Sequence, residues 1–297
     1  MKTNVDVVVI GCGPAGIQAG IHSSRKKAET VIIGKMRNSS LYGAHVENYF
    51  GIKGKTDGSL LLRTGLEQAA SFGCTHIDLN VIGASADEDG FRIKAESGEE
   101  IVCRSVVIAT GTSRMKLNIP GEKEFHGKGV SYCAECDCNF FKGLKVAIVG
   151  DESEAAVSAE LMTEYASTVY WVSNGISASS NLVDKARDAG VKIIEGIPKA
   201  IEGDTDVKRL ILGDDRSIEV DGVFIELGGR SSAYLAMDLG LMPETDDSIK
   251  VDSNCETSVT GLFACGDITG RPWQLAKAVG EGAVAGLSAA ERARYAK

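Results

Sequence analysis

The sequence predicts an α/β protein with two Rossmann-like nucleotide-binding folds. An apolar strand at Val5–Ile10 leads through a glycine turn into a helical pattern, which is the order that a dinucleotide-binding unit requires. A second such strand, Lys145–Val149, is followed by Gly150 and a helical stretch over Ala155–Tyr165. The chain has 297 residues, enough for two domains that each bury a core.

Composition narrows the class of protein. The chain is 43% hydrophobic and 25% charged, as is usual for globular proteins. The formal charge of −9 argues against nucleic acid as a partner. The first apolar run is too short for a signal peptide, and no segment reaches membrane-spanning length. With eight cysteines at irregular spacing and no export signal, we expect a cytoplasmic protein with mostly free thiols.

The turn after the first strand reads Gly11-Cys12-Gly13-Pro14-Ala15-Gly16. Gly11 permits the turn, Gly13 lets the backbone approach a pyrophosphate, and Gly16 allows close packing of helix on strand. The next strand, Thr30–Ile33, ends in Gly34-Lys35, so it lacks the acid that usually binds a ribose. We expect backbone, or Ser39 and Ser40, to take that role.

Two further apolar strands end in small residues. Ser105–Ile108 runs into Ala109-Thr110-Gly111-Thr112, and Gly261–Cys265 runs into Gly266-Asp267. An aspartate at such a place can accept hydrogen bonds from a ribityl hydroxyl, although a Gly-Asp pair is more often a simple turn.

Cys133 and Cys136 form a Cys-x-x-Cys pair, which can close and open a small disulfide. A metal site would need two more ligands at matching spacing, and the sequence has no second such motif, so we expect no metal. A purely structural disulfide is the other alternative, but so short a loop stabilises little. The pair therefore indicates redox chemistry.

Taken together, these motifs resemble the flavoprotein disulfide reductases, specifically the low-molecular-weight thioredoxin reductases. The resemblance covers nearly the whole chain and also includes Glu47-Asn48-Tyr49, Ser131-Tyr132 before the cysteines, and Gln274. It implies two three-layer ββα domains, the second inserted in the first. An FAD domain would comprise residues 1–113 and 244–297, and residues 114–243 would form an NADPH-domain-like insertion with the cysteine pair. It also implies thioredoxin as substrate and a homodimer.

The resemblance assigns candidate residues for FAD at several positions. The candidates are Gly11, Cys12, Gly13, Pro14, Ala15, Gly16, Gly34, Lys35, Ser39, Ser40, Leu41, Asn48, Ala109, Thr110, Gly111, Gly266, Asp267, Trp273, Gln274, Leu275 and Ala276. Trp273 stands where arginine is common in the family, and its indole could stack near the flavin, shield it or pack in the core. The helix predicted at Leu275–Tyr295 is rich in alanine and glycine, which suits close packing against the first fold.

The second nucleotide fold departs from the family pattern. Its turn reads Gly150-Asp151-Glu152-Ser153-Glu154, with acids where the family has glycines, and negative charge there repels a phosphate. The following strand, Thr168–Val172, leads into residues 173–180 with no arginine for a 2′-phosphate and no acid for a ribose. Residues 114–243 carry 21 acidic and 14 basic side chains, a charge of −7. We therefore expect the nicotinamide site to be lost.

Electrons must then come from another donor. The resemblance points to the ferredoxin-dependent flavin thioredoxin reductases, and ferredoxins are usually acidic. Residues 1–55 carry eight basic and three acidic side chains, a local charge of +5 that favours such a partner, although a run of positive side chains is usually just a solvated face. Three alternatives remain open: an NAD(P)H-dependent reductase with an atypical site, a flavin-dependent dithiol oxidase, and a non-catalytic redox sensor.

The resemblance also assigns roles at the cysteines. Cys136 would face the flavin, Cys133 would attack thioredoxin, and Asp137 would exchange protons with the thiolate. Asp137 could instead cap a helix. Cys138 could reshuffle the disulfide, but we favour simple packing. The other cysteines, Cys12, Cys74, Cys103, Cys255 and Cys265, lie in or beside apolar segments and are expected in the core, and Cys12 could contact FAD through its backbone. His45 stays unassigned.

Overall fold

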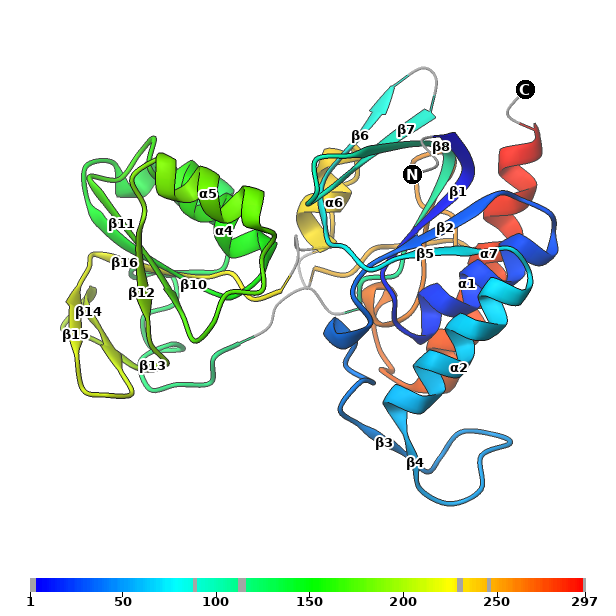
Figure 1. The fold of residues 1–297 in the computed structure, drawn as a ribbon, viewed down its shortest axis with the longest axis horizontal. Helices are drawn as coiled ribbons and strands as arrows, with labels where there is room; N and C mark the ends of the chain where they lie inside the picture. The colour runs from blue at the N-terminus through cyan, green and yellow to red at the C-terminus, as the bar shows by residue number, and fades with distance from the viewer. Residues whose placement is uncertain (1–3, 88–89, 112–115, 229–231, 245–246, 296–297) are drawn as a thin grey trace. The chain divides into compact units, whose positions relative to one another are not determined.

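The chain, which the computed structural model describes over residues 4–87, 90–111, 116–228, 232–244 and 247–295, divides into two units. Residues 1–113 and 230–297 form the first unit, and residues 114–229 form the second (Figure 1). The predicted boundary at 113/114 lies outside the described residues. Residues 232–243, which were predicted in the second unit, belong to the first, because Leu235, Ala236, Leu239 and Leu241 pack in its core.

The first unit is built on a seven-stranded sheet in the order β5-β2-β1-β8-β7-β6, with β17 also paired to β8. Strands β5, β2, β1, β8 and β17 are parallel, whereas β6 and β7 continue from β8 as an antiparallel meander. The strands are β1 (Asn4–Ile10), β2 (Thr30–Ile33), β5 (Thr75–Ile77), β6 (Val81–Asp87), β7 (Gly90–Ala95), β8 (Glu100–Ile108) and β17 (Leu262–Ala264). A separate small hairpin joins β3 (His45–Val46) to β4 (Thr56–Asp57).

The alternation of β1 explains the three layers of this unit. Val7 and Val9 pack in the core shared with the helices, and Val8 and Ile10 pack in the core shared with the meander. The helices are α1 (Pro14–Arg25), α2 (Gly58–Ser71), α6 (Ser232–Asp238) and α7 (Leu275–Tyr295), with 3-10 turns at Met36–Asn38 and Asp267–Thr269.

The predicted close packing of α7 is confirmed. A Cβ at Gly282 would lie 2.2 Å from the carbonyl oxygen of Ala15, and one at Gly286 would lie 2.2 Å from that of Ala19. Because only glycine fits at both places, α7 can lie directly against α1.

The second unit repeats the plan with a five-stranded parallel sheet in the order β12-β11-β10-β16-β9. A three-stranded antiparallel meander, β13-β14-β15, shares a core with this sheet, and α4 packs against strands β10 and β11. Its strands are β9 (Val130–Ser131), β10 (Lys145–Val149), β11 (Thr168–Ser173), β12 (Lys192–Glu195), β13 (Pro198–Gly203), β14 (Val207–Leu212), β15 (Ser217–Glu219) and β16 (Gly222–Ile225). Its helices are α3 (Ala134–Asp137), α4 (Ser153–Met162) and α5 (Ser180–Asp188), with a 3-10 turn at Cys138–Phe141.

The second fold is thus an α/β unit in which one helix differs from its predicted range at both ends. The sequence pattern predicted a helix over Ala155–Tyr165, whereas α4 spans Ser153–Met162. The helix begins earlier than predicted because Ser153 and Glu154 of the acidic turn already belong to its first turn. No helix in the described part of the chain is long and apolar enough to cross a membrane.

Candidate active site

The glycine turn after β1 is tightly enclosed by neighbouring backbone. Gly11 has φ +117°, its N–H donates to the carbonyl of Ile33 at 2.8 Å, and a Cβ there would lie 2.3 Å from the carbonyl oxygen of Ala109. A Cβ on Gly16 would lie 2.0 Å from the carbonyl oxygen of Gly11. Only glycine fits at these two positions, so the start of α1 lies directly against the strand edge.

Gly13 differs from the two enclosed glycines. A Cβ there would meet only the Ser39 side chain, with the hydroxyl at 3.4 Å. The turn therefore leaves space beside the Gly13 backbone at the N-terminus of α1, with a hydroxyl next to it, and Pro14 occupies the first helical turn. Such a place fits a pyrophosphate.

The end of β2 carries a buried ion pair that the sequence did not reveal. Lys35 Nζ lies 2.9 Å from the carboxylate of Glu96, and both side chains are largely buried. Glu96 also accepts a hydrogen bond of 3.1 Å from the Asn80 amide. Glu96 comes from the β7–β8 turn, so no local sequence pattern signals its pairing with Lys35.

Two distant candidates meet beside the loop after β2. The Asn48 side-chain amide donates to the Gln274 carbonyl oxygen at 3.3 Å, across 226 residues of sequence. Nearer the turn, the Ser39 hydroxyl accepts from the Leu41 amide at 3.3 Å, and Ser40 is exposed. The structure therefore brings the loop and the start of α7 together.

The strand end at Ala109-Thr110-Gly111 lies beside the glycine turn. Ala109 N–H donates to the carbonyl of Ile10 at 2.8 Å, and Gly111 has φ +78° with open space where a Cβ would be. Thr112 lies outside the described residues. Because β1, β2, β8 and β17 are parallel, their carboxyl ends share this edge.

A lysine holds the loop that follows β17. Lys277 Nζ donates to the carbonyls of Gly266 and Gly270 at 2.8 and 2.9 Å and lies 3.2 Å from the Glu281 carboxylate. Glu281 in turn accepts from the Gly266 amide at 2.9 Å. Burial raises the pKa of Asp267, Lys277 opposes that shift, and Glu281 reinforces it. Neither Lys277 nor Glu281 was among the predicted residues.

The segment before α7 is open to solvent. Trp273 is 49% exposed, so the core alternative is wrong, and the Arg271 guanidinium lies 4.1 Å from the centre of its ring. Leu275 is half-buried and Ala276 exposed at the start of α7. These side chains are available to a ligand at the same edge.

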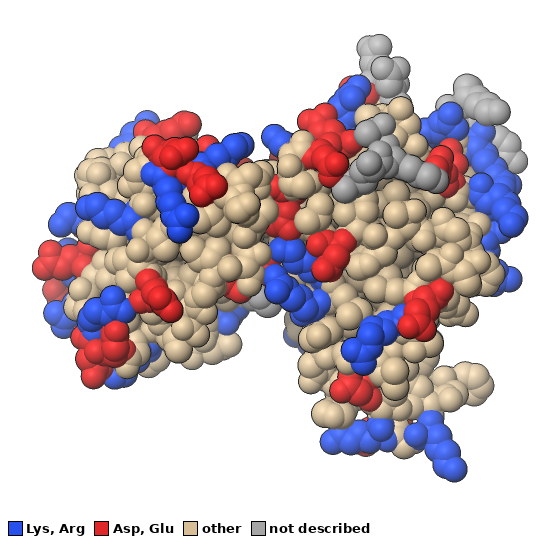
Figure 2. Space-filling view, in the orientation of Figure 1, with Lys and Arg blue, Asp and Glu red and all other residues tan. Residues whose placement is uncertain are grey.

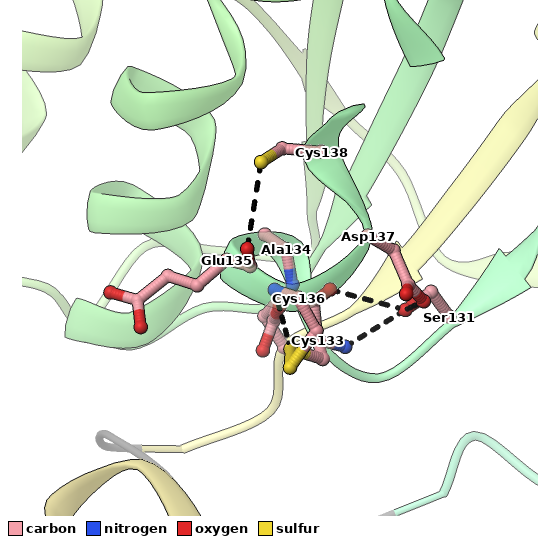
Figure 3. Close-up of a disulfide and its surroundings, with 8 residues drawn as sticks. Ser131, Cys133, Ala134, Glu135, Cys136, Asp137 and Cys138 are labelled. Atoms are coloured by element: carbon pink, nitrogen blue, oxygen red, sulfur yellow. Dashed lines mark hydrogen bonds between the residues drawn. A yellow bond between two sulfur atoms is a disulfide. The ribbon is translucent and has the colours of Figure 1, made fainter. Parts of the chain in front are cut away.

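In the second unit, Cys133 and Cys136 form the predicted disulfide, with their Cα atoms 5.3 Å apart (Figure 3). The Cys136 amide donates to the Cys133 sulfur at 2.8 Å, at the start of the short helix α3. Cys133 is buried and Cys136 is exposed, so in this closed state a partner reaches Cys136 more readily. The assignment of Cys133 as the attacking thiol stays a prediction.

Asp137 is connected to the pair through a serine. The Ser131 hydroxyl lies 2.7 Å from Asp137 Oδ2 and accepts from the Cys133 amide at 3.0 Å (Figure 3). The carboxylate is half-buried, and Ser131 links it to the backbone of Cys133. Asp137 ends α3 and occupies the N-cap position of the 3-10 turn Cys138–Phe141, but its side chain makes no capping hydrogen bond there.

Cys138 is buried and free, as are the other five unpaired cysteines. Its thiol donates to the Glu135 carbonyl at 3.5 Å, and Figure 3 shows it on the other side of the α3 turn from the disulfide. Burial raises the pKa of Cys12 and Cys103 to about 12 and of Cys74 to about 11. Such thiols are poor nucleophiles, so the predicted core role is confirmed for them.

The second nucleotide turn, after β10, holds buried acidic side chains and is hydrogen-bonded to neighbouring segments of the second unit. Glu152 and Glu154 are buried at the start of α4, and the Glu154 amide donates to the Gly228 carbonyl at 3.4 Å. The amides of Ser177 and Ala178 donate to the Asp151 carbonyl at 2.7 and 3.0 Å. Two backbone hydrogen bonds therefore tie the loop after β11 to this turn.

A second buried acid, Glu226 at the end of β16, was also missed by the sequence reasoning. Its Oε1 accepts from the Ala134 amide at 2.8 Å, directly after Cys133. This hydrogen bond joins the end of β16 to the start of α3. Glu226 and Ala134 are 92 residues apart in the chain, so no spacing pattern reveals the contact.

Comparisons with known proteins agree with this site. The family model described as pyridine nucleotide-disulphide oxidoreductase matches residues 5–282. A thioredoxin reductase of Aquifex aeolicus is 34% identical over 275 residues, which are 89% of this chain and 85% of that protein. The structure of the atypical thioredoxin reductase TRi from Desulfovibrio vulgaris Hildenborough is 32% identical with a TM-score of 0.79, covering 97% of this chain and 98% of that one. The structure of a ferredoxin-flavin thioredoxin reductase from Clostridium acetobutylicum is 33% identical, with a TM-score of 0.69 and 99% of both chains covered.

Proposed function

The chain belongs to the pyridine nucleotide-disulphide oxidoreductase family, and we propose that it reduces thioredoxin with electrons from reduced ferredoxin. At the coarser level it is a flavoprotein disulfide reductase of the thioredoxin reductase type, and FAD is its cofactor. The identity of the donor and of the substrate belongs to the proposal.

The first unit offers a cradle that fits FAD. The open backbone at Gly13 and the hydroxyl of Ser39 suit the pyrophosphate, and Asp267 suits a ribityl hydroxyl. Asn48 and Gln274 lie at the same edge. When bound, FAD would supply the two-electron step between donor and disulfide.

The cysteines then carry the electrons onward. Opening the Cys133–Cys136 disulfide takes two electrons and one proton and leaves one thiol and one thiolate. The Cys133 thiolate attacks the thioredoxin disulfide, and Cys136 resolves the mixed disulfide. The enzyme disulfide re-forms as the thioredoxin dithiol leaves, and Asp137 exchanges the protons through its place beside Ser131.

The observation that carries the donor proposal is the burial of two acidic side chains at the second nucleotide turn, after β10. A phosphate there would meet the buried carboxyls of Glu152 and Glu154, and one amide of the turn already donates to Gly228. Bringing charge of the same sign into a buried place is strongly unfavourable. Without a nicotinamide site, a protein donor is the consistent source of electrons.

Only some of the basic residues within 1–55 can belong to one docking surface for the donor. Because α1 runs back along β1, Arg25, Lys26 and Lys27 lie at the end of the unit away from the glycine turn. Lys35 is occupied by Glu96. The predicted basic segment is therefore not one patch.

Two of the remaining basic residues lie in the loop between β3 and β4. Lys53 and Lys55 are exposed in the loop between β3 and β4, and Phe50 in the same loop is 99% exposed. Figure 2 shows basic side chains near the lower end of the first unit, where Figure 1 places this loop. An exposed aromatic residue flanked by lysines suits an acidic protein partner.

The deciding experiment is anaerobic flavin absorbance. NADPH, NADH and then photoreduced ferredoxin are added in turn, and thioredoxin thiols are counted afterwards. We expect bleaching and thiol formation with ferredoxin alone. Rapid bleaching by NADPH would overturn the donor proposal.

One observation favours the atypical nicotinamide alternative. A groove at the ends of β11 and β12 is lined by Asn174, Asp214 and Arg216, so tertiary structure brings an arginine near the strand end. Its guanidinium already binds Asp214 at 2.7 Å and the Glu195 carbonyl at 2.6 Å. NADPH titration decides between the two, and oxygen uptake with a small dithiol would instead indicate the oxidase.

The implied homodimer also belongs to the proposal. Its mass in solution, measured by light scattering at several concentrations, tests it.

A further inference from the structure

Glu226 occupies an unusual place for a carboxyl group. It follows the last residue of β16, is 3% exposed, and accepts the Ala134 amide at 2.8 Å. Ala134 directly follows Cys133 and is the first residue of α3. The hydrogen bond therefore joins this acid to the backbone that holds the redox pair.

The charged groups that act on Glu226 are themselves acidic. Glu154 comes from α4, Glu135 comes from α3, and the Ser158 hydroxyl of α4 donates to the carboxyl group. Burial raises the pKa of Glu226 well above its ordinary value, Glu154 raises it further, and the bonds from Ala134 and Ser158 oppose the shift. Two buried carboxyl groups so close cannot both ionise easily, so the group retains a proton at higher pH than an ordinary glutamate.

The proposed thiol chemistry does not use this acid. Asp137 serves the pair from the side of Ser131, and Glu226 contacts the backbone from β16. Reduction of the disulfide nevertheless creates a thiolate one residue from the Ala134 amide. New negative charge in a poorly solvated place raises the proton affinity of a neighbouring carboxylate, and the effect is reciprocal.

We propose that Glu226 is a positioning residue that sets the reduction potential of the Cys133–Cys136 pair by taking up a proton when the pair is reduced. Two electrons and one proton open the disulfide and leave one thiol and one thiolate. If Glu226 is ionised in the oxidised protein, it takes up a second proton from solvent when the pair is reduced. The inference rests on the proposed function only for the source of the electrons.

The test is a redox titration of the full-length protein with reduced and oxidised glutathione, read by thiol alkylation and mass spectrometry. It is run between about pH 6 and 9 on the wild type and on Glu226→Gln, which keeps an oxygen to accept the Ala134 amide but cannot ionise. Glu160→Gln, at a half-buried position of the same helix α4, is the matched control. The pH dependence of glutathione itself cancels between variants.

At alkaline pH we expect Glu226→Gln to favour the reduced pair by about tenfold, which is the effect of one charge at about 10 Å in a partly buried place. The two proteins should converge at acidic pH, where Glu226 is neutral in both redox states. Glu160→Gln should follow the wild type throughout.

Parallel curves for Glu226→Gln and the wild type at every pH would overturn the proposal. If Glu226→Gln does not fold, Glu154→Gln is tested instead, because it removes the charge beside Glu226. The pH-dependent part of the redox titration should then lie at lower pH than in the wild type. A titration with the same pH dependence as the wild type would also refute the proposal. Neither ferredoxin nor thioredoxin enters this titration, so its failure is distinct from failure of the donor proposal.

Discussion

The Ser177 amide donates a hydrogen bond of 2.7 Å to the Asp151 carbonyl, which ties the loop after β11 to the second nucleotide turn. Because this bond uses backbone atoms, replacing the acidic side chains does not reopen the turn. The double variant Asp151→Gly, Glu152→Gly should therefore still fail to bleach the flavin with NADPH. Stopped-flow absorbance measures this, with ferredoxin reduction as the control for an intact flavin. Fast NADPH reduction in the variant would show that the side chains alone block the site.

Reversing charge in the β3–β4 loop should slow the donor. We expect Lys53→Glu with Lys55→Glu to lower the second-order rate of flavin reduction by ferredoxin about tenfold at low salt, and less at high salt. The control is Lys26→Glu with Lys27→Glu, which makes the same change at the far end of α1. Equal losses in both variants would mean that net charge, and not this loop, controls the encounter.

Asp137→Asn should slow the thiol step by about 10- to 100-fold, the usual contribution of a positioned acid or base. The amide can still bind Ser131 but cannot exchange a proton. Single-turnover reduction of thioredoxin by the pre-reduced enzyme isolates this step, and Glu135→Gln is the exposed neighbouring control. An unchanged rate would leave Asp137 only a structural role.

Lys277→Met should weaken FAD binding. The lysine satisfies two carbonyls of the Gly266–Gly270 loop, and removing it leaves those groups and Glu281 without their cation. We expect about a fivefold or greater rise in the dissociation constant for FAD, measured by flavin fluorescence with the apoprotein. Lys185→Met on the exposed side of α5 controls for charge loss. Wild-type affinity would show that the loop holds its shape without the lysine.

Stability should depend on pH through Glu226. Its pKa is raised by burial and by Glu154, so the folded protein keeps a proton that the unfolded chain has already lost. The free energy of unfolding should therefore fall as pH rises from the ordinary carboxyl range toward the raised pKa, by up to about 1.4 kcal/mol per pH unit. Urea unfolding at several pH values should show a shallower fall for Glu226→Gln. Identical slopes would place the pH dependence elsewhere.

Much of the fold could be read from periodicity. The strand at Lys145–Val149 and the helix at Leu275–Tyr295 have the predicted bounds, because continuous apolar runs and small-residue patterns specify them locally. The end of α4 and the boundary near residue 230 could not be predicted in this way. The boundary depends on which unit the apolar segment with Leu235 and Leu239 packs in, and these leucines would suit either unit by composition.

The candidate site shows the same division. Glycines that need φ above zero or close backbone contact, such as Gly11 and Gly16, are visible in sequence because no other residue fits. Glu96 and Lys277 could not be identified from the sequence, because Lys35 and the carbonyls of Gly266 and Gly270 that they bind lie outside their own elements. A charged residue by itself usually indicates only a solvated surface.

The sequence by itself therefore determined the two nucleotide folds, the redox cysteines and the acidic second turn, since each is written in neighbouring residues. Only the tertiary structure decided that the loop after β11 is hydrogen-bonded to that turn and that Glu226 binds the amide beside Cys133. It also separated the basic residues of the first unit to its two ends. The physical reason is that burial and charge act over distances of a few ångströms in space, and the folded chain brings together groups that are far apart in sequence.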